Sequence, residues 1–362
     1  MRGSGVRGDD TVTGFSSNGP TRGRVRFDNG KFWVDNLFKP DLVAPGNRIV
    51  GALGSDRRTT TNGWNALAVT YPELAAVEGA TQQPAQELMY LSGTSVSAPV
   101  VSGTVALMLQ VNPGLTPPLV KAILQYTAQP LPNYSLMAQG TGMLNVEGAV
   151  RLAQALRTDL RTAIEAGTIR PGDSLLAPGA AMPASYSVLG GQGAPWSRMV
   201  VIGGNRLARG DALFTQYQPI WDHRLTWVGK AVLRRFAYYQ GTDKGVPANT
   251  VPYAIVETSA PNQPLVGGGV RMLDPVFSAL GVTKGLFKAP VTQIMALADS
   301  GLGVTINTGF ATQGGYMTLE GQVIGQGLIF SEGLIYSEGL VFSEVLSSDP
   351  ARRIDASIKG EP

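Results

Sequence analysis

The 362-residue sequence predicts an α/β fold followed by a β-rich region. Residues 87–91 (ELMYL) are typical of a strand, and an uncharged helix-forming stretch follows them from Gly93 onward. Two further helical patterns follow, one after Thr116 and one over 146–160. Strands that alternate with helices are typical of a sheet covered by helices. Beyond residue 160, short apolar runs separated by Gly and Pro favour short strands instead.

Composition narrows the class of protein. A hydrophobic content of 43% is enough for a sizeable core, and the net charge is only +3. The chain has 0 cysteines, which excludes disulfides and thiolate metal sites. Arg22, Arg24 and Arg26 form a close basic group, which we interpret as one solvated strand face and not as a nucleic-acid site. We expect neither a nucleic-acid partner nor a membrane span.

Ser95 stands where the strand becomes the helix. Because the following residues, up to Val111, are apolar with few interruptions, we expect a core helix that is buried on every side. The first turn of a helix offers unpaired N–H groups that can stabilise an oxyanion. Gly93 allows the tight turn that such a site needs. The alternative is that Ser95 serves only as the helix N-cap.

Four segments in chain order carry a family resemblance. They are FSSNGPT (15–21), KPDLVAPG (39–46), GTSVSAP (93–99) and GTGMLNVEGAV (140–150). Together they resemble the subtilisin-like serine proteases, the subtilases of the peptidase S8 family. The resemblance implies a parallel sheet with flanking helices, and a hydrolase that cleaves peptide bonds.

The resemblance also implies roles for residues of the serine motif. Ser95 is the expected nucleophile, and its backbone N–H is the expected half of an oxyanion hole. Gly93, Thr94 and Pro99 complete the motif, while Val96 replaces the methionine that is usual in the family.

The base that should activate Ser95 is missing upstream. A serine hydroxyl needs a base, and in this family the order along the chain is Asp, His, Ser. The one histidine, His223, follows Ser95, and a lone histidine is usually structural or on the surface. We therefore expect residues 1–160 to be the C-terminal part of a catalytic domain, a fragment that lacks the Asp and His and is inactive alone. The alternative is a truncated or decayed, non-catalytic module with a binding or attachment role.

The remaining chain is expected to divide into three parts. Residues 161–320 are predicted to be a β-rich accessory region. Residues 321–346 hold hexapeptide β repeats that begin at Gly321, Gly327, Gly333 and Gly339. A period of six keeps the same residues on one strand face, because six is a multiple of two. Residues 347–362 are read as a polar tail.

Expectations for cofactors, partners and location come from the resemblance. No cofactor is required, and no metal site is assignable, although Ca²⁺ occurs in the parent family. Asp41 aligns with a position that helps to hold a cation in some relatives, but we favour a structural role in its turn. The expected partners are a protein or peptide substrate and the missing N-terminal part of the same catalytic domain. The resemblance points to a secreted or cell-envelope protein of a bacterium, with no signal peptide visible in this chain.

Overall fold

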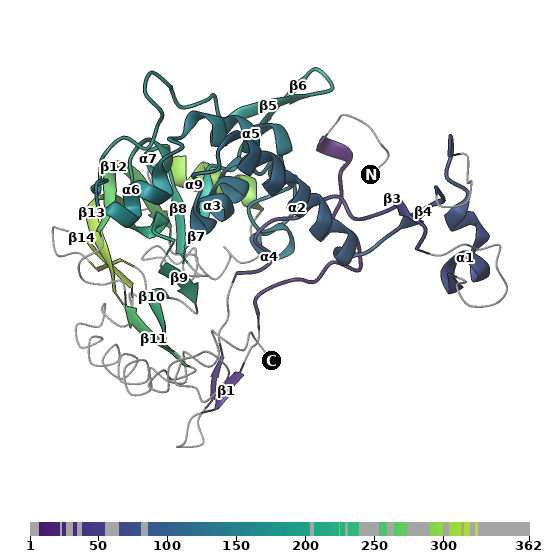
Figure 1. The fold of residues 1–362 in the computed structure, drawn as a ribbon, viewed down its shortest axis with the longest axis horizontal. Coiled ribbons are helices and arrows are strands. Elements are labelled where there is room, and N and C mark those ends of the chain that lie inside the picture. The colour runs from purple at the N-terminus through teal and green to yellow at the C-terminus, as the bar shows by residue number, and fades with distance from the viewer. Residues whose placement is uncertain are drawn as a thin grey trace.

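The computed structural model shows helices at the centre, strands at one end and an arm at the other (Figure 1). The structure describes most residues between 7 and 223, and beyond these a set of helical and strand segments that ends at residue 324. The ranges described before residue 224 are 7–21, 24–26, 32–34, 38–54, 65–80, 86–202 and 206–223.

Short elements make up the N-terminal part and the arm. They are η1 (Arg7–Asp9), β1 (Arg24–Arg26), β2 (Phe32–Val34), β3 (Ile49–Ala52), α1 (Ala66–Thr70), η2 (Pro72–Ala75) and β4 (Leu88–Leu91). Strands β3 and β4 pair antiparallel and carry α1 and η2 on the arm. The predicted strand before Ser95 is confirmed as β4.

Helices form the centre of the molecule. They are α2 (Thr94–Val111), α3 (Pro117–Thr127), α4 (Leu136–Gln139), α5 (Val146–Ala155) and α6 (Leu160–Ala166). The single helix predicted over 146–160 is wrong, because the chain leaves the helix at Leu156 before α6 begins. The Asn112 side chain explains the break. It donates hydrogen bonds to the carbonyls of Ala153, Leu156 and Arg157, which a continuing helix would use itself.

The C-terminal part is rich in antiparallel strands. Its elements are β5 (Tyr186–Leu189), β6 (Gln192–Pro195), β7 (Met199–Ile202), β8 (Arg206–Arg209), α7 (Ala212–Thr215), η3 (Pro219–Trp221), β9 (Leu225–Val228), β10 (Ala231–Tyr238), β11 (Tyr253–Thr258), β12 (Pro264–Leu273), α9 (Val291–Asp299), β13 (Val304–Thr312), β14 (Gly315–Thr318) and β15 (Val323–Ile324). The largest sheet has six strands in the order β15-β14-β13-β12-β8-β7. Apart from Val323 and Ile324, the predicted hexapeptide repeats lie outside the described residues, as does the whole polar tail.

The mixed α/β class is confirmed, but the parallel sheet is not found in the described part of the chain. Every pairing between named strands there is antiparallel, and one isolated parallel bridge joins Val43 to Met143. The reason at the serine segment is local. Strand β4 pairs with β3, the strand before it in the chain, and the chain returns through the arm in the opposite direction.

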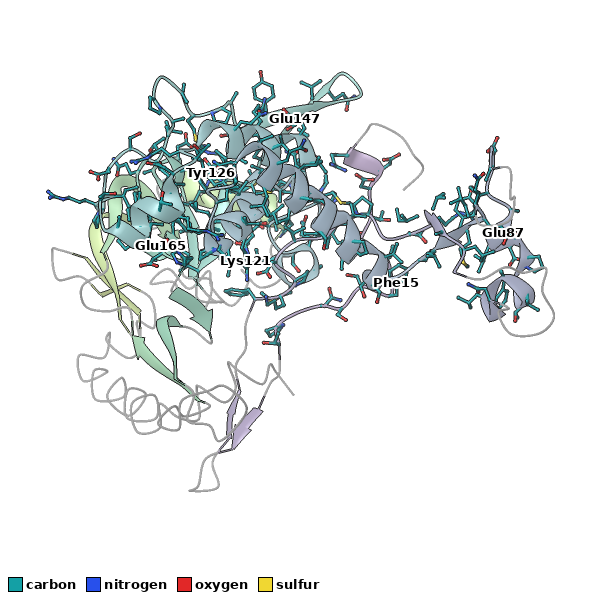
Figure 2. All side chains as sticks on the ribbon, viewed as in Figure 1. Phe15, Glu87, Lys121, Tyr126, Glu147 and Glu165 are labelled. Atoms are coloured by element: carbon teal, nitrogen blue, oxygen red, sulfur yellow. The ribbon has the colours of Figure 1, made fainter. Side chains whose placement is uncertain are left out.

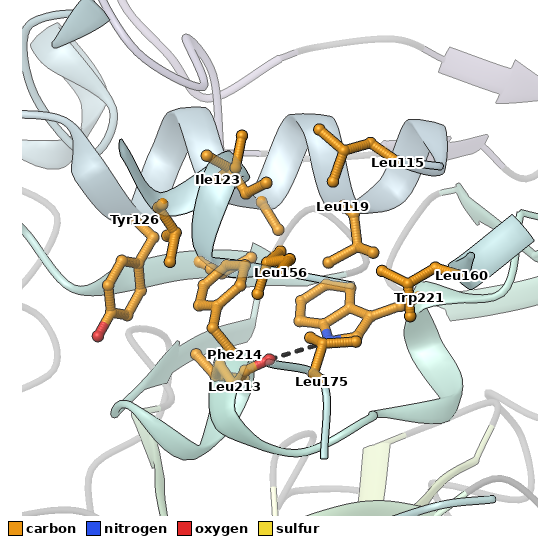
Figure 3. Close-up of a cluster of buried hydrophobic side chains, with 14 of the residues drawn as sticks. Leu115, Leu119, Ile123, Tyr126, Leu156, Leu160, Leu175, Leu213, Phe214 and Trp221 are labelled. Carbon is orange, nitrogen blue, oxygen red and sulfur yellow. Dashed lines mark hydrogen bonds between the residues drawn. The ribbon is translucent and has the colours of Figure 1, made fainter. Parts of the chain in front are cut away.

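The core is built on α3. Its predicted buried residues Leu119, Ala122, Ile123 and Tyr126 are all buried, as the helical spacing required. They pack against residues that lie far along the chain, including Leu213, Phe214 and Trp221 (Figure 3).

Aromatic packing fixes this core geometrically. The Tyr126 and Phe214 rings meet edge to face with centroids 4.7 Å apart, and Phe214 stacks on Trp221 at 5.7 Å. The Trp221 indole N–H donates to the carbonyl of Leu213 at 2.9 Å, shown as the dashed line in Figure 3. One continuous core thus joins residues on both sides of position 160, where we predicted a domain boundary; the boundary itself stays a prediction.

The prediction that α2 is buried on every side is wrong. Of its 18 residues, Thr104 and Met108 are buried. In the described part of the chain, α2 is also the one helix long and apolar enough to cross a membrane, judged by length and composition alone. One side of α2 packs on the core cluster through Val100, Val101 and Val105, and the other side is exposed.

Candidate active site

The serine turn is built by a glycine in an unusual conformation. Gly93 has φ of 150° and occupies the N-cap position of α2, where it has no side chain to accept a hydrogen bond. Helix α2 begins at Thr94, so Ser95 is its second residue and is exposed. Ser95 is therefore not the N-cap, which removes that alternative. The leading N–H groups of a helix have no partner within it and can meet a developing negative charge.

A second turn supports the serine turn from beside it. The N–H of Gly93 donates to the Gly46 carbonyl at 2.8 Å, and the Arg48 N–H donates to Ser92 Oγ at 2.9 Å. Ser92 Oγ in turn donates to Asn47 Oδ1 at 3.0 Å. These bonds hold the turn at residues 45–48 against the start of α2.

Ser97 adds one more contact between the two turns. Its Oγ donates to the Ala44 carbonyl at 3.1 Å. A Cβ on Gly46 would lie 2.0 Å from Ser97 Oγ and 2.8 Å from the Gly93 carbonyl oxygen, so only glycine fits there. Sequence reasoning missed the supporting roles of Ser92, Ser97 and Asn47. Their signal was their position inside or beside two motifs, but no spacing rule predicted that these motifs touch.

All four family segments meet at one pocket. Its volume is about 370 Å³, and its lining includes Phe15 from the first segment, Leu42 from the second, Thr94 from the third and Met143 from the fourth. The second and fourth segments also exchange backbone hydrogen bonds, from Val43 to Gly142 and from Leu144 to Val43. The structure thus brings together segments that are up to 128 positions apart, from Phe15 to Met143. The lining includes mainly small or apolar side chains at the N-terminus of α2.

Asp41 is held by protein cations. Its carboxylate lies 2.7 Å from Lys39 Nζ and 3.1 Å from Lys121 Nζ, and it accepts a hydrogen bond from Gln125 at 3.0 Å. Burial alone would raise the pKa of Asp41, but the two ammonium groups outweigh this and hold it below its usual value. Burial is also the main reason why the pKa of Lys121 is lowered. Asp41 therefore ties its turn to α3, the structural role that we favoured.

His223 lies away from the serine pocket. Its Nε2 is 3.5 Å from Glu165 Oε1 of α6. Figure 2 shows Glu165 and Phe15 well separated, with the central helices between them in the view. Neither His223 nor Asp222 lines the pocket. Within the described residues, no group of three or more His, Asp or Glu side chains is arranged to hold a metal ion.

Comparison with known proteins agrees with this geometry. Residues 4–149 match the model of the subtilase family. Serine protease AprX of Bacillus subtilis (strain 168) is 30% identical over 142 residues, which is 39% of this chain and 26% of AprX. Subtilisin-like protease SBT1.7 of Arabidopsis thaliana is 30% identical over 142 residues, 39% of this chain and 14% of that protein.

Another Arabidopsis relative extends the same pattern. Subtilisin-like protease SBT4.14 is 31% identical over 120 residues, 33% of this chain and 12% of that protein. The chain thus spans about a quarter or less of the length of these relatives. Residues 4–149 of this chain belong to the subtilase family of serine proteases.

Proposed function

We propose that this chain carries the nucleophile part of a subtilisin-like serine endopeptidase, with Ser95 as the nucleophile. The observation that carries the proposal is the convergence of four family segments on one pocket at the start of α2. Gly93, Thr94 and Pro99 shape the turn and first helical residues around Ser95. The substrate class is a protein or peptide, as membership of a protease family implies.

The proposed chemistry follows from the position of Ser95. Its Oγ attacks a peptide carbonyl while a base takes the hydroxyl proton, and the carbonyl oxygen becomes an oxyanion. The N–H groups at the start of α2 stabilise that oxyanion, and the leaving amine takes a proton from the protonated base. Water then hydrolyses the acyl-enzyme and restores the hydroxyl. This chemistry requires no cofactor.

The base is proposed to come from polypeptide outside these 362 residues. His223 is paired with Glu165 and lies outside the lining of the serine pocket. We propose that a histidine and an aspartate from the remainder of a subtilase catalytic domain complete the site. Location in the bacterial cell envelope or outside the cell is part of the same proposal.

A chimera tests this function directly. The part of AprX that precedes its matched segment is joined to residue 4 of this chain, and the product is treated with a fluorophosphonate probe. We expect the chimera to be labelled and its Ser95→Ala variant not to be. Ser102→Ala is the matched control, because Ser102 is also an exposed serine of α2 and donates only to the Ala98 carbonyl at 3.2 Å.

The chain by itself should remain unlabelled. Residues 1–362 lack a base at the pocket, and members of a catalytic triad act as a unit. Labelling of the isolated chain that depends on Ser95 would show that a base is present within it. A folded chimera without Ser95-dependent labelling would favour the second candidate, a non-catalytic subtilase module used for binding or attachment. The specific observation behind that candidate is the engagement of the one histidine by Glu165.

A further inference from the structure

The exposed side of α2 is a continuous face that begins at Ser95. Ser95, Ala98, Ser102, Ala106 and Leu109 are all exposed, and their spacing of three or four residues places them on one side of the helix. We call these five residues the open face. Leu107 beside it is 45% exposed and Leu109 is 39% exposed. An apolar helix side of about five turns is unusual on a protein surface and marks an interaction site.

Two grooves make the surroundings of the open face concave. The larger, of about 670 Å³, lies between α2 and α3 and is lined by Ala98, Val105 and Leu109 on one side and by Val120 and Leu124 on the other. The smaller is the serine pocket described above. The two grooves share Leu42, Ala98 and Val101, so they form one apolar surface that leads along α2 to the site of Ser95.

The charges of this surface show which occupant fits. Helix α2 contains no charged residue. In the larger groove, Asp41 and Lys121 neutralise each other in an ion pair of 3.1 Å, and Arg161 is the remaining charged lining residue. Nucleic acid requires a basic surface, and a helix that lies on a membrane carries basic and bulky aromatic residues. The open face has neither feature, so it fits a neutral, apolar layer of protein.

Resting on the function proposed above, we propose that the open face is the docking surface for the polypeptide that supplies the catalytic histidine and aspartate. Ala98, Ser102 and Ala106 have small side chains that let a neighbouring backbone approach closely. Ser95 belongs to the same face, so a layer that covers the face also reaches the Ser95 hydroxyl. The relatives contain ample further polypeptide, because the match covers 26% of AprX and 14% of SBT1.7.

Hydrogen exchange on an inactive chimera tests the docking separately from the chemistry. The probe is the AprX–chain chimera with Ser95→Ala, compared with residues 1–362 carrying the same substitution. We expect the amide hydrogens of α2 to exchange at least about tenfold more slowly in the chimera, since burial under a second layer removes local opening. Ala106→Glu places a charge on the open face and should abolish this protection. Val188→Glu is the control, because Val188 is 63% exposed on β5 and lies outside the open face.

Several results would overturn the docking proposal. One is a chimera that unfolds cooperatively by near-ultraviolet circular dichroism but has unchanged exchange in α2. Another is full protection in the Ala106→Glu variant. A third is a dimer of residues 1–362 that Ala106→Glu dissociates, because a second copy would then be the occupant. Protection of α2 without fluorophosphonate labelling of the Ser95 chimera would leave the docking intact and sink the proposed function.

Discussion

Helices α2 and α3 are neighbours in the chain and are treated very differently by the fold. Helix α3 alternates apolar and polar positions, and its apolar side is fully covered by residues from both ends of the core. Helix α2 is apolar almost throughout, yet Thr104 and Met108 are its buried residues. The covering of α3 comes from segments as distant as Phe214 and Trp221. Apolar composition alone therefore shows that a helix needs a cover, and the described residues supply that cover to α3 but only on one side to α2.

A matched pair of leucine truncations gives the largest expected difference between the two helices. Leu119 on α3 is 0% exposed, and Leu107 on α2 is 45% exposed. Leu119→Ala should lower the free energy of unfolding by about 2–5 kcal/mol, because it leaves a cavity in the core. Leu107→Ala should change it by no more than about 0.5 kcal/mol, as surface substitutions usually do.

Urea unfolding of residues 1–362 followed by circular dichroism measures both changes. Equal costs at the two positions would mean that α2 is covered in the isolated chain. The comparison between the helices would then fail.

The tie between the second family segment and α3 predicts a dependence on pH. The pKa of Asp41 is lowered in the folded protein, so its contribution to stability is present above the unfolded value of 3.8 and is lost as the pH falls below it. Asp41→Asn also leaves Lys121 without its carboxylate partner, at a cost of about 1–3 kcal/mol at neutral pH.

Unfolding free energies between pH 7 and pH 3 check this prediction. The loss of stability on acidification should be shallower in Asp41→Asn than in the unchanged chain. The Arg157–Asp159 pair supplies a control, since Asp159→Asn removes a more exposed ion pair and should cost less. Parallel pH curves for Asp41→Asn and the unchanged chain would contradict the assigned role of Asp41.

The contact between the two turns at the serine site predicts a steric effect. Gly46→Ala introduces a Cβ that meets Ser97 Oγ and the Gly93 carbonyl, and the backbone must shift. We expect a loss of roughly 1–3 kcal/mol in unfolding free energy, and weaker labelling of Ser95 in the chimera. In Gly46→Ala combined with Ser97→Ala, part of the loss should be recovered. No recovery would place the conflict with the Gly93 carbonyl instead.

Sequence reasoning predicted the site well where motifs and helical spacing decide the outcome. The position of Ser95 at the start of α2 and the buried side of α3 both follow from local rules that need no distant partner. The break at Leu156 was not predictable in the same way, because it depends on Asn112, 44 residues earlier. The exposure of α2 was missed for the same kind of reason. Periodicity shows that a residue is apolar, whereas burial depends on which other segments reach it.

The smallest expected effect separates the open face from a merely irregular surface. Gly103 lies in α2, and a Cβ added there meets nothing within 4 Å. Gly103→Ala should therefore raise the unfolding free energy of residues 1–362 by about 0.5–1 kcal/mol, because alanine loses less backbone entropy than glycine in a helix. In the chimera the same methyl group would stand between α2 and the layer that covers it, so the gain should shrink or become a loss. Denaturant titrations of the four proteins, chain and chimera with and without Gly103→Ala, measure this difference. An equal gain in both backgrounds would mean that this turn of α2 stays open to solvent even when the remainder of the catalytic domain is present.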